Sequence, residues 1–289
     1  MTADILSARV ANKYIANCKA ISLGGPGRNS ELAYNAFMNN LDKLQEVYES
    51  LIDEESRKTF YGYWLGNISH KFGELNHVCL PHYVLSGFMP KENDVFIDVG
   101  VCDGGTSVKF KNLGCKVYGF EMDKKNFEIA KKVAAENEFI VENFGLDCLN
   151  HEVKYNPTGA ATSINPNGSE TAQVKTLDYY VEKNNLSSVD FIKLDVEGAE
   201  LNVLKGAATT IVRFKPIIAV SAYHKWDDFW ILTDFLKLLR PDYEFAMRQY
   251  PESREDIPTW FKNNEDEIYY SMGLEPTIKT WEEVVLFAK

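Results

Sequence analysis

From residue 93 onward, short apolar runs alternate with stretches in which apolar residues recur every three or four positions. This alternation is typical of βαβ units, in which helices connect the strands of a parallel sheet and cover both of its faces. Seven strands are predicted, at residues 95–99, 115–120, 138–144, 191–194, 217–222, 243–247 and 284–288. Residues 156–170, rich in Gly, Pro, Ser, Thr and Asn, are predicted to form a surface loop or a loosely paired hairpin.

The segment before residue 93 follows a helical pattern. Over residues 30–58 the apolar side chains that share one helical stripe are Phe37, Leu41, Leu44, Tyr48 and Leu51. Such a stripe favours packing on the chain's own domain, and a homodimer formed through this helix is the alternative. We therefore expect a helical extension or cap over residues 1–92 and an α/β domain over residues 93–289.

Composition narrows the range of partners and compartments. The formal net charge of −11 disfavours a nucleic-acid partner, because affinity for phosphates comes mainly from Lys and Arg. No stretch is long and apolar enough to span a membrane, so no membrane association is expected. The five cysteines are odd in number and form no C-x-x-C pair, which is typical of reduced thiols. A cytoplasmic protein acting on a small or neutral partner is the expectation.

The glycine-containing sequence VFIDVGVCDGGTS, residues 95–107, is the strongest sign of a ligand site. An apolar strand runs into a glycine turn and then into a helix, and open α/β sheets bind nucleotides at the carboxyl end of this strand. Gly100 and Gly104 let the backbone approach a ligand closely. Asp98 is predicted either to orient the loop or to meet a charged part of the ligand, and Thr106 is a further candidate contact.

A second strand ends in Glu121 and Met122, about 20 residues after the first glycine, where a carboxylate can bind ribose hydroxyls. This geometry alone does not separate a nicotinamide dinucleotide from other nucleosides. However, the second glycine of a G-x-G-x-x-G loop counted from Gly100 is replaced by Cys102, which disfavours a pyrophosphate site. A nicotinamide-dependent oxidoreductase remains an alternative.

The sequence SSVDFIKLDVEGAELNVLKGA at residues 187–207, with VKTLDYY before it and KPIIAVSAYHK after it, closely resembles the FkbM-type methyltransferases. The resemblance covers roughly residues 94–250. It implies a class I methyltransferase fold, which is a Rossmann-like α/β fold with a seven-stranded, mostly parallel sheet and an antiparallel last strand. It also implies S-adenosylmethionine as the cofactor and, for most members, methylation of a hydroxyl group in making polyketides, glycans or other specialised products.

By position, the resemblance also implies roles for single residues. Asp98 and Gly100 would lie at the methionine end of the cofactor and Glu121 at its ribose. Either Asp147 or Asn143 would contact adenine, and the sequence does not separate the two. Asp195 would lie beside the reacting centre. Apart from the resemblance, Asp195 and Glu197 are candidates either for positioning the acceptor or for contacting the ammonium group of the cofactor.

Three side chains are candidates for catalysis because they follow the fourth and fifth strands: Asp195, Glu197 and His224. An imidazole with a pKa near 6.5 can accept a hydroxyl proton at neutral pH, so His224 is the predicted base, oriented by Asp227 or Asp228. The competing hypothesis is Mg²⁺ bound by Asp195, Glu197 and Asp227, since Mg²⁺ prefers oxygen ligands.

The acceptor side is less well defined by the sequence. Arg248 and Tyr250, at the end of the sixth strand, are predicted to face a small-molecule or glycan acceptor. Residues 251–281 are predicted to cover the site. Glu200 is interpreted as a helix-start charge favoured by the helix dipole. Besides the methyltransferase and the oxidoreductase, a cofactor-binding protein without catalysis is the third hypothesis.

Overall fold

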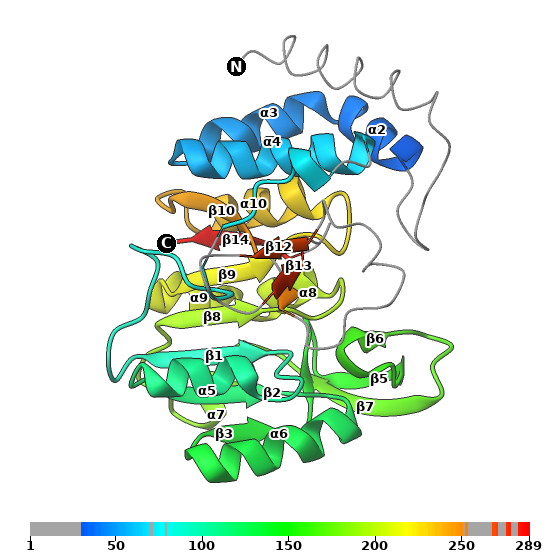
Figure 1. Ribbon diagram of the computed structural model, residues 1–289. Helices are drawn as coiled ribbons and strands as arrows, with labels where there is room; N and C mark the ends of the chain where they lie inside the picture. The colour runs from blue at the N-terminus through cyan, green and yellow to red at the C-terminus, as the bar shows by residue number, and fades with distance from the viewer. Residues whose placement is uncertain are drawn as a thin grey trace. The chain divides into compact units, whose positions relative to one another are not determined.

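The computed structural model describes residues 30–69, 72–78, 80–250, 252–253, 268–270, 276–278 and 283–289. Its main sheet has seven strands in the order β10-β14-β9-β8-β1-β2-β3 (Figure 1). Their bounds are β1 (Val95–Val99), β2 (Lys116–Phe120), β3 (Ile140–Glu142), β8 (Phe191–Leu194), β9 (Ile217–Ser221), β10 (Phe245–Gln249) and β14 (Val284–Ala288). All seven predicted strands are confirmed, with ends that shift by a few residues.

The sheet is mostly parallel. From β3 through β2, β1 and β8 to β9, neighbouring strands pair in parallel, whereas β14 runs opposite to β8 and β9 (Figure 1). Every residue of β1, β8 and β14 is buried, as expected for strands covered on both faces. In the register of β1 with β8, Asp98 lies opposite Lys193, so two charged residues face each other inside an apolar sheet.

The helices that connect the strands begin and end at recognisable residues. They are α5 (Gly105–Asn112), α6 (Lys124–Asn137), α7 (Leu177–Lys183), α8 (Glu200–Gly206), α9 (Ala208–Phe214) and α10 (Asp228–Leu239). Asp123 caps α6 because its carboxylate accepts hydrogen bonds from the amides of Lys125 and Asn126. Gly114, at φ +89°, follows α5 in the left-handed conformation that ends many helices. In Figure 1, α5 covers β1 and β2.

The N-terminal helices are shorter than the sequence pattern predicts. Instead of one helix over residues 30–58, there are α2 (Ser30–Met38), α3 (Leu41–Ser50) and α4 (Glu54–Ser69), and a short 3-10 helix η1 (Phe72–Glu74) follows. A turn at Asn39 and Asn40 and an extended residue at Leu51 interrupt the helical pattern. The apolar stripe persists across these breaks, because Phe37, Leu44 and Leu51 are all buried.

The chain forms two compact units that interleave in sequence. One consists of Met1–Pro81, Lys225–Thr233 and Glu244–Leu286, and the other of His82–His224, Asp234–Tyr243 and Phe287–Lys289. Within the first unit, α4 packs on β10 and the hydroxyl of Ser56 accepts a hydrogen bond from the amide of Met247. The division into a helical extension over residues 1–92 and an α/β domain over residues 93–289 stays a prediction.

A smaller sheet that the pattern did not predict belongs to the second unit. It contains β4 (Gly145–Leu146), β5 (His151–Asn156), β6 (Ser163–Ile164) and β7 (Glu170–Lys175), in the order β4-β7-β5-β6. The segment predicted as a loop or loose hairpin, 156–170, holds a 3-10 helix η2 (Gly159–Ala161) and β6, which pairs with β5. The strands on either side of this segment, β5 and β7, pair in regular antiparallel register, so the hairpin is more regular than the loose pairing expected.

The predicted cover over residues 251–281 falls for the most part outside the described residues, including Trp260, Phe261 and Trp281. The described parts form a three-stranded sheet of β11 (Glu252–Ser253), β13 (Pro276–Ile278) and β12 (Ile268–Tyr270). In the described residues, no helix has the length and apolar character that crossing a membrane requires.

Candidate active site

Asp98 and Lys193 form a buried ion pair beneath the glycine loop. Lys193 Nζ lies 3.1 Å from Asp98 Oδ1, and both side chains are almost completely buried. Ser107 donates a hydrogen bond of 2.7 Å to Asp98 Oδ2. Burial would lower the pKa of Lys193, but the charges of Asp98 and Asp195 outweigh it and raise that pKa. Of the two roles predicted for Asp98, this geometry favours orienting the loop.

The same lysine holds the loop by its backbone. Lys193 Nζ donates to the carbonyl of Gly100 at 2.6 Å and lies 3.4 Å from the carbonyl of Val99. Gly100 adopts φ +81°, and a Cβ at this position would collide with the carbonyl oxygen of Asp195. Glycine is therefore required here because the end of β8 approaches the loop closely.

The other loop candidates lie at the start of α5. Gly104, at φ +95°, precedes the helix and is buried against the side chain of Val133. Thr106 lies in the first turn of α5 and is partly exposed. Gly104 thus packs α5 against α6, whereas Thr106 offers a hydroxyl that is accessible to a ligand.

Glu121 links the loop to the end of β2. Its Oε2 accepts a hydrogen bond of 2.9 Å from the amide of Cys102, and its Oε1 accepts one of 2.8 Å from the amide of Asp123. The side chain is mostly buried, and this burial raises the pKa of Glu121 although the two amide hydrogen bonds act in the opposite direction. Each carboxylate oxygen has a second lone pair, so ribose hydroxyls could still donate to it.

The candidate adenine contacts differ in burial. Asp147 is only 4% exposed, and its Oδ1 accepts a hydrogen bond of 2.7 Å from the amide of Cys148. Asn143 is exposed, and its side-chain amide donates 3.0 Å to the carbonyl of Glu121. Met122 is partly exposed and follows Glu121 directly. Asn143 is thus tied to the backbone that carries the predicted ribose-binding residue.

These residues fit a cofactor that carries positive charge. Glu121, Asp147, Asp195 and Glu197 follow strands of the second unit, and Asp195 Oδ1 is a buried oxygen without a hydrogen-bond partner among the described residues. S-adenosylmethionine brings a sulfonium, an ammonium group and a ribose, all of which suit carboxylate oxygens. The pyrophosphate of a dinucleotide would instead meet like charge.

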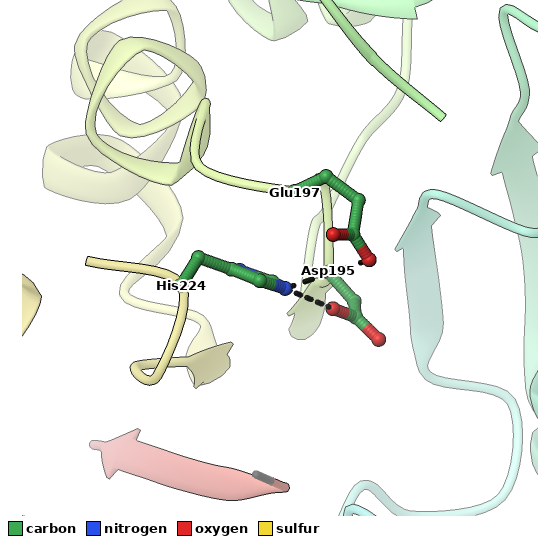
Figure 2. Close-up of side chains that lie close together, drawn as sticks. All are labelled: Asp195, Glu197 and His224. Carbon is green, nitrogen blue, oxygen red and sulfur yellow. Dashed lines mark ion pairs between the residues drawn. The ribbon is translucent and has the colours of Figure 1, made fainter. Parts of the chain in front are cut away.

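Figure 2 shows the three catalytic candidates converging at the ends of β8 and β9. His224 Nε2 lies 3.6 Å from Asp195 Oδ1 and 3.6 Å from Glu197 Oε1. The imidazole is only 8% exposed, whereas the two carboxylate side chains are 26% and 28% exposed. The carboxylates therefore lie between a buried ring and the solvent.

The partner that orients His224 is Glu200, which the sequence analysis interpreted as a helix-start charge. His224 Nδ1 lies 2.8 Å from Glu200 Oε1, and the side chain of Glu200 is 1% exposed. The same oxygen accepts hydrogen bonds from the amides of Val196 and Gly198 at 3.0 and 3.3 Å. The predicted partner Asp228 instead accepts a hydrogen bond from the amide of Lys225.

This environment changes the expected role of His224. Burial would lower the pKa of the imidazole, but the neighbouring carboxylates of Glu197, Glu200 and Asp195 outweigh it and raise the pKa to about 11. The ring is therefore protonated at neutral pH in the protein alone. The pKa therefore lies above the value near 6.5 that the sequence analysis assumed, and the role of His224 as a base stays a prediction.

The backbone of the turn after β8 brings the two carboxylates together. Glu197 adopts φ +53° and Gly198 φ +94°, so two successive residues take the left-handed conformation. Such a conformation is uncommon for a residue other than glycine and persists where the surroundings enforce it. Tyr83 donates a hydrogen bond of 2.9 Å to Asp195 Oδ2 and leaves Oδ1 on the side of His224.

Arg248 and Tyr250 lie in the first unit. The guanidinium of Arg248 forms a two-pronged interaction with Asp53, at 3.2 Å to Oδ1 and 2.9 Å to Oδ2, and it donates to the hydroxyl of Ser56 at 2.7 Å. Tyr250 is fully buried, and this burial raises the pKa of its phenol. Both side chains thus have structural roles in their own unit, and contact with an acceptor stays a prediction.

The main residues of the site that sequence reasoning missed are Lys193, Glu200 and Tyr83. Lys193 could have been found, because a lysine within an apolar strand requires an opposite charge and Asp98 lies in another apolar strand. Glu200 was not predicted to orient His224, because an acid at the start of a helix is already explained by its favourable interaction with the helix dipole. No spacing in the sequence connects Tyr83 with Asp195.

The strand order identifies the class of fold. The last strand of the chain, β14, lies between β9 and β10, whereas the dinucleotide-binding order 3-2-1-4-5-6 has no such inserted strand. A seven-stranded, mostly parallel sheet with this inserted antiparallel strand defines the class I methyltransferase fold. The sequence model of the family described as methyltransferase FkbM domain matches residues 98–263, which is more than half of the 289 residues. The chain belongs to the FkbM methyltransferase family.

Two relatives illustrate this membership. The chain is 28% identical over 127 residues to the hexuronic acid methyltransferase AglP of Haloferax volcanii, a match that covers 42% of this chain and 53% of that protein. The crystal structure of methyltransferase FkbM from Methylobacillus flagellatus KT is similar with a TM-score of 0.68 and 20% identity. That match covers 88% of this chain and 60% of the other, so this chain spans little more than half the length of each relative.

Proposed function

We propose that this chain transfers the methyl group of S-adenosylmethionine to a hydroxyl group of a small-molecule or glycan acceptor. The observation that carries the proposal is the contact between the predicted cofactor loop and the cluster of catalytic candidates. Gly100 of the cofactor loop touches the backbone of Asp195, and the side chain of Asp195 belongs to the cluster with Glu197 and His224. A cofactor held by the loop would therefore place its reacting carbon close to these acids.

Glu121 is the residue proposed to bind the cofactor's ribose, and Lys193 fixes the loop that precedes it. When bound, S-adenosylmethionine supplies a methyl group that is already activated by its sulfonium. The protein's task is then mainly to align the acceptor and to manage its proton. Asp195 Oδ1, which has no hydrogen-bond partner among the described residues, is suited to accept a hydrogen bond from the acceptor hydroxyl.

A sugar is the proposed class of acceptor. The support is the similarity to a protein whose name describes methylation of a hexuronic acid, over 42% of this chain. A carbohydrate hydroxyl has a high pKa, so its oxygen has to lose a proton before or during methyl transfer. Because His224 is protonated in the protein alone, Asp195 and Glu197 are better placed than the imidazole to receive that proton.

Calorimetric titration with S-adenosylmethionine tests the cofactor without knowledge of the acceptor. We expect saturable binding by the wild type and binding at least about 10-fold weaker for Glu121→Ala, because the loop and the ribose both lose a carboxylate partner. Glu152→Ala, which removes an exposed acid on β5, is the matched control and should bind like the wild type. Binding of NAD in place of S-adenosylmethionine would instead support an oxidoreductase.

Turnover separates an enzyme from a protein that only binds the cofactor. Formation of S-adenosylhomocysteine would be followed with glucuronic acid, glucose and their glycosides as acceptors. Turnover with any of these that is lost in Asp195→Asn supports methylation of a sugar hydroxyl. Cofactor binding without turnover on this panel would contradict the proposed acceptor class.

A further inference from the structure

The three side chains in Figure 2 have the spacing of ligands to one ion. One ligand atom from each of Asp195, Glu197 and His224 lies within 4.8 Å of the others, and the two distances to Nε2 are 3.6 Å. A nitrogen and an oxygen 3.6 Å apart do not form a hydrogen bond. Ligand atoms about 2.1 Å from a shared metal ion lie roughly 3.0 to 3.5 Å apart in tetrahedral or octahedral geometry.

A second observation points to a ligand at the same place. Nε2 of His224 is buried and has no hydrogen-bond partner among the described residues, although the imidazole is only 8% exposed. Asp195 Oδ1 is buried without a hydrogen-bond partner in the same way. A buried polar atom that lacks a hydrogen bond costs free energy, so two such atoms facing each other indicate a missing partner between them.

The surrounding residues orient these two atoms. Nδ1 of His224 lies 2.8 Å from Glu200 Oε1, so Nδ1–H can donate to this carboxylate, and a cation that displaces the proton from Nε2 would bind the lone pair of the ring there. A carboxylate behind a histidine is the usual support of a metal-binding imidazole. On the opposite side, the hydrogen bond from Tyr83 to Asp195 Oδ2 leaves Oδ1 as the free ligand atom.

We propose that Asp195, Glu197 and His224 bind one divalent cation, with Oδ1, Oε1 and Nε2 as the ligand atoms. The mixed set of two carboxylates and one imidazole fits Mn²⁺ better than Mg²⁺, which favours oxygen ligands alone. This ligand set differs from the set predicted from the sequence, because His224 takes the place of Asp227. Among the described residues, Asp227 is not part of the cluster.

Three protein ligands leave coordination positions open for water and for an oxygen of the acceptor. The two carboxylate side chains are 26% and 28% exposed, so the open side is accessible. This role rests on the proposed function. With the cation bound, Asp195 and Glu197 would serve as its ligands and would no longer receive the acceptor proton. The cation would lower the pKa of a bound acceptor hydroxyl, whose proton would pass to water. The acceptor oxygen would then form a bond to the methyl carbon as the bond from carbon to sulfur breaks.

A cation also makes the site compatible with an acidic sugar. Without it, the carboxylate of a hexuronic acid would approach Asp195 and Glu197 against like charge. With a divalent ion between them, that carboxylate and a neighbouring hydroxyl can both reach the metal. The class of acceptor that fits is therefore a sugar with two adjacent oxygen ligands.

The binding step can be tested with Mn²⁺ alone, on the full chain freed of metals by chelation. Calorimetric titration should give one saturable site in the wild type. Glu197→Gln and His224→Gln should bind at least about 10-fold more weakly, and Glu200→Gln about 10- to 100-fold more weakly through the loss of its support. The control is His151→Gln, because His151 Nε2 lies 3.7 Å from Asp147 Oδ2 in a similar pair that has no third ligand among the residues that the structure describes.

Two results would overturn the cation site: no saturable Mn²⁺ binding by the wild type, or wild-type affinity in folded Glu197→Gln. Glu197 is the decisive position, because its side chain is partly exposed and its replacement should leave the fold intact, as circular dichroism would check. S-adenosylmethionine is titrated separately. A chain that binds the cofactor but not Mn²⁺ refutes only the cation site, whereas a chain that binds Mn²⁺ but no cofactor refutes only the proposed function.

Discussion

Removing Lys193 tests how the cofactor loop is held. Lys193→Met leaves the Asp98 carboxylate fully buried with Ser107 as its remaining hydrogen-bond partner. Breaking a buried ion pair by removing one partner costs about 3–5 kcal/mol. At an effective dielectric constant near 20, the attraction across the 3.1 Å between Nζ and Oδ1 is about 5 kcal/mol, which is of the same order. We therefore expect the free energy of unfolding to fall by about 3–5 kcal/mol.

Urea unfolding followed by circular dichroism measures this loss. The double variant Asp98→Asn with Lys193→Met should recover at least about 1 kcal/mol, because no uncompensated charge remains. Lys124→Met is the matched control, since Lys124 pairs with Glu170 at 3.9 Å on the surface and should contribute less than about 1 kcal/mol. The reasoning is refuted if Lys193→Met unfolds within 1 kcal/mol of the wild type, or if the double variant is no more stable than the single one.

Three further predictions follow from the loop and the ion pairs. Gly100→Ala should lower the free energy of unfolding, measured in urea, by more than about 2 kcal/mol and should abolish cofactor binding. The reason is that residue 100 has φ +81° and that the new methyl group would collide with the carbonyl of Asp195. Unchanged stability would contradict this. Glu121→Gln should bind S-adenosylmethionine more weakly in calorimetry yet more tightly than Glu121→Ala, since one oxygen still accepts an amide hydrogen bond; equal affinities of the two variants would be the contrary result. Burial would raise the pKa of Asp53, but hydrogen bonds from Arg248 and from its own turn outweigh it and lower the pKa to about 2. Its stabilising contribution is thus fully present above pH 3.8 and is lost as the pH falls through about 2, so unfolding of Arg248→Met should depend less on pH in this range than that of the wild type.

The main sheet could be predicted from the sequence because its strands are buried on both faces. β1, β8 and β14 are continuous apolar runs, apart from Asp98 and Lys193, and they begin and end where predicted. The smaller sheet was missed for the opposite reason. β5 and β7 alternate exposed and buried residues and carry several charges, so hydrophobic pattern alone did not distinguish them from a polar loop.

The site was predictable where one short segment carries its residues. Asp195 and Glu197 lie in the motif that resembles the family, and their convergence with His224 follows from the meeting of strand ends at one edge of a parallel sheet. What the sequence could not provide is the electrostatic environment of the imidazole. The raised pKa of His224 depends on Glu197 and Glu200 together, and the position of Glu200 after the turn has an equally good local explanation as a helix-start charge.

The contact between Gly100 and the Asp195 carbonyl has a consequence for protein engineering. Exchanging the turn at residues 195–198 for that of a relative would test whether this turn contributes to the proposed acceptor site. The backbone of this turn is in close contact with the loop after β1, at Gly100. A donor turn with a different backbone path would therefore displace the glycine loop as well. The two segments should be transplanted together, as a single module.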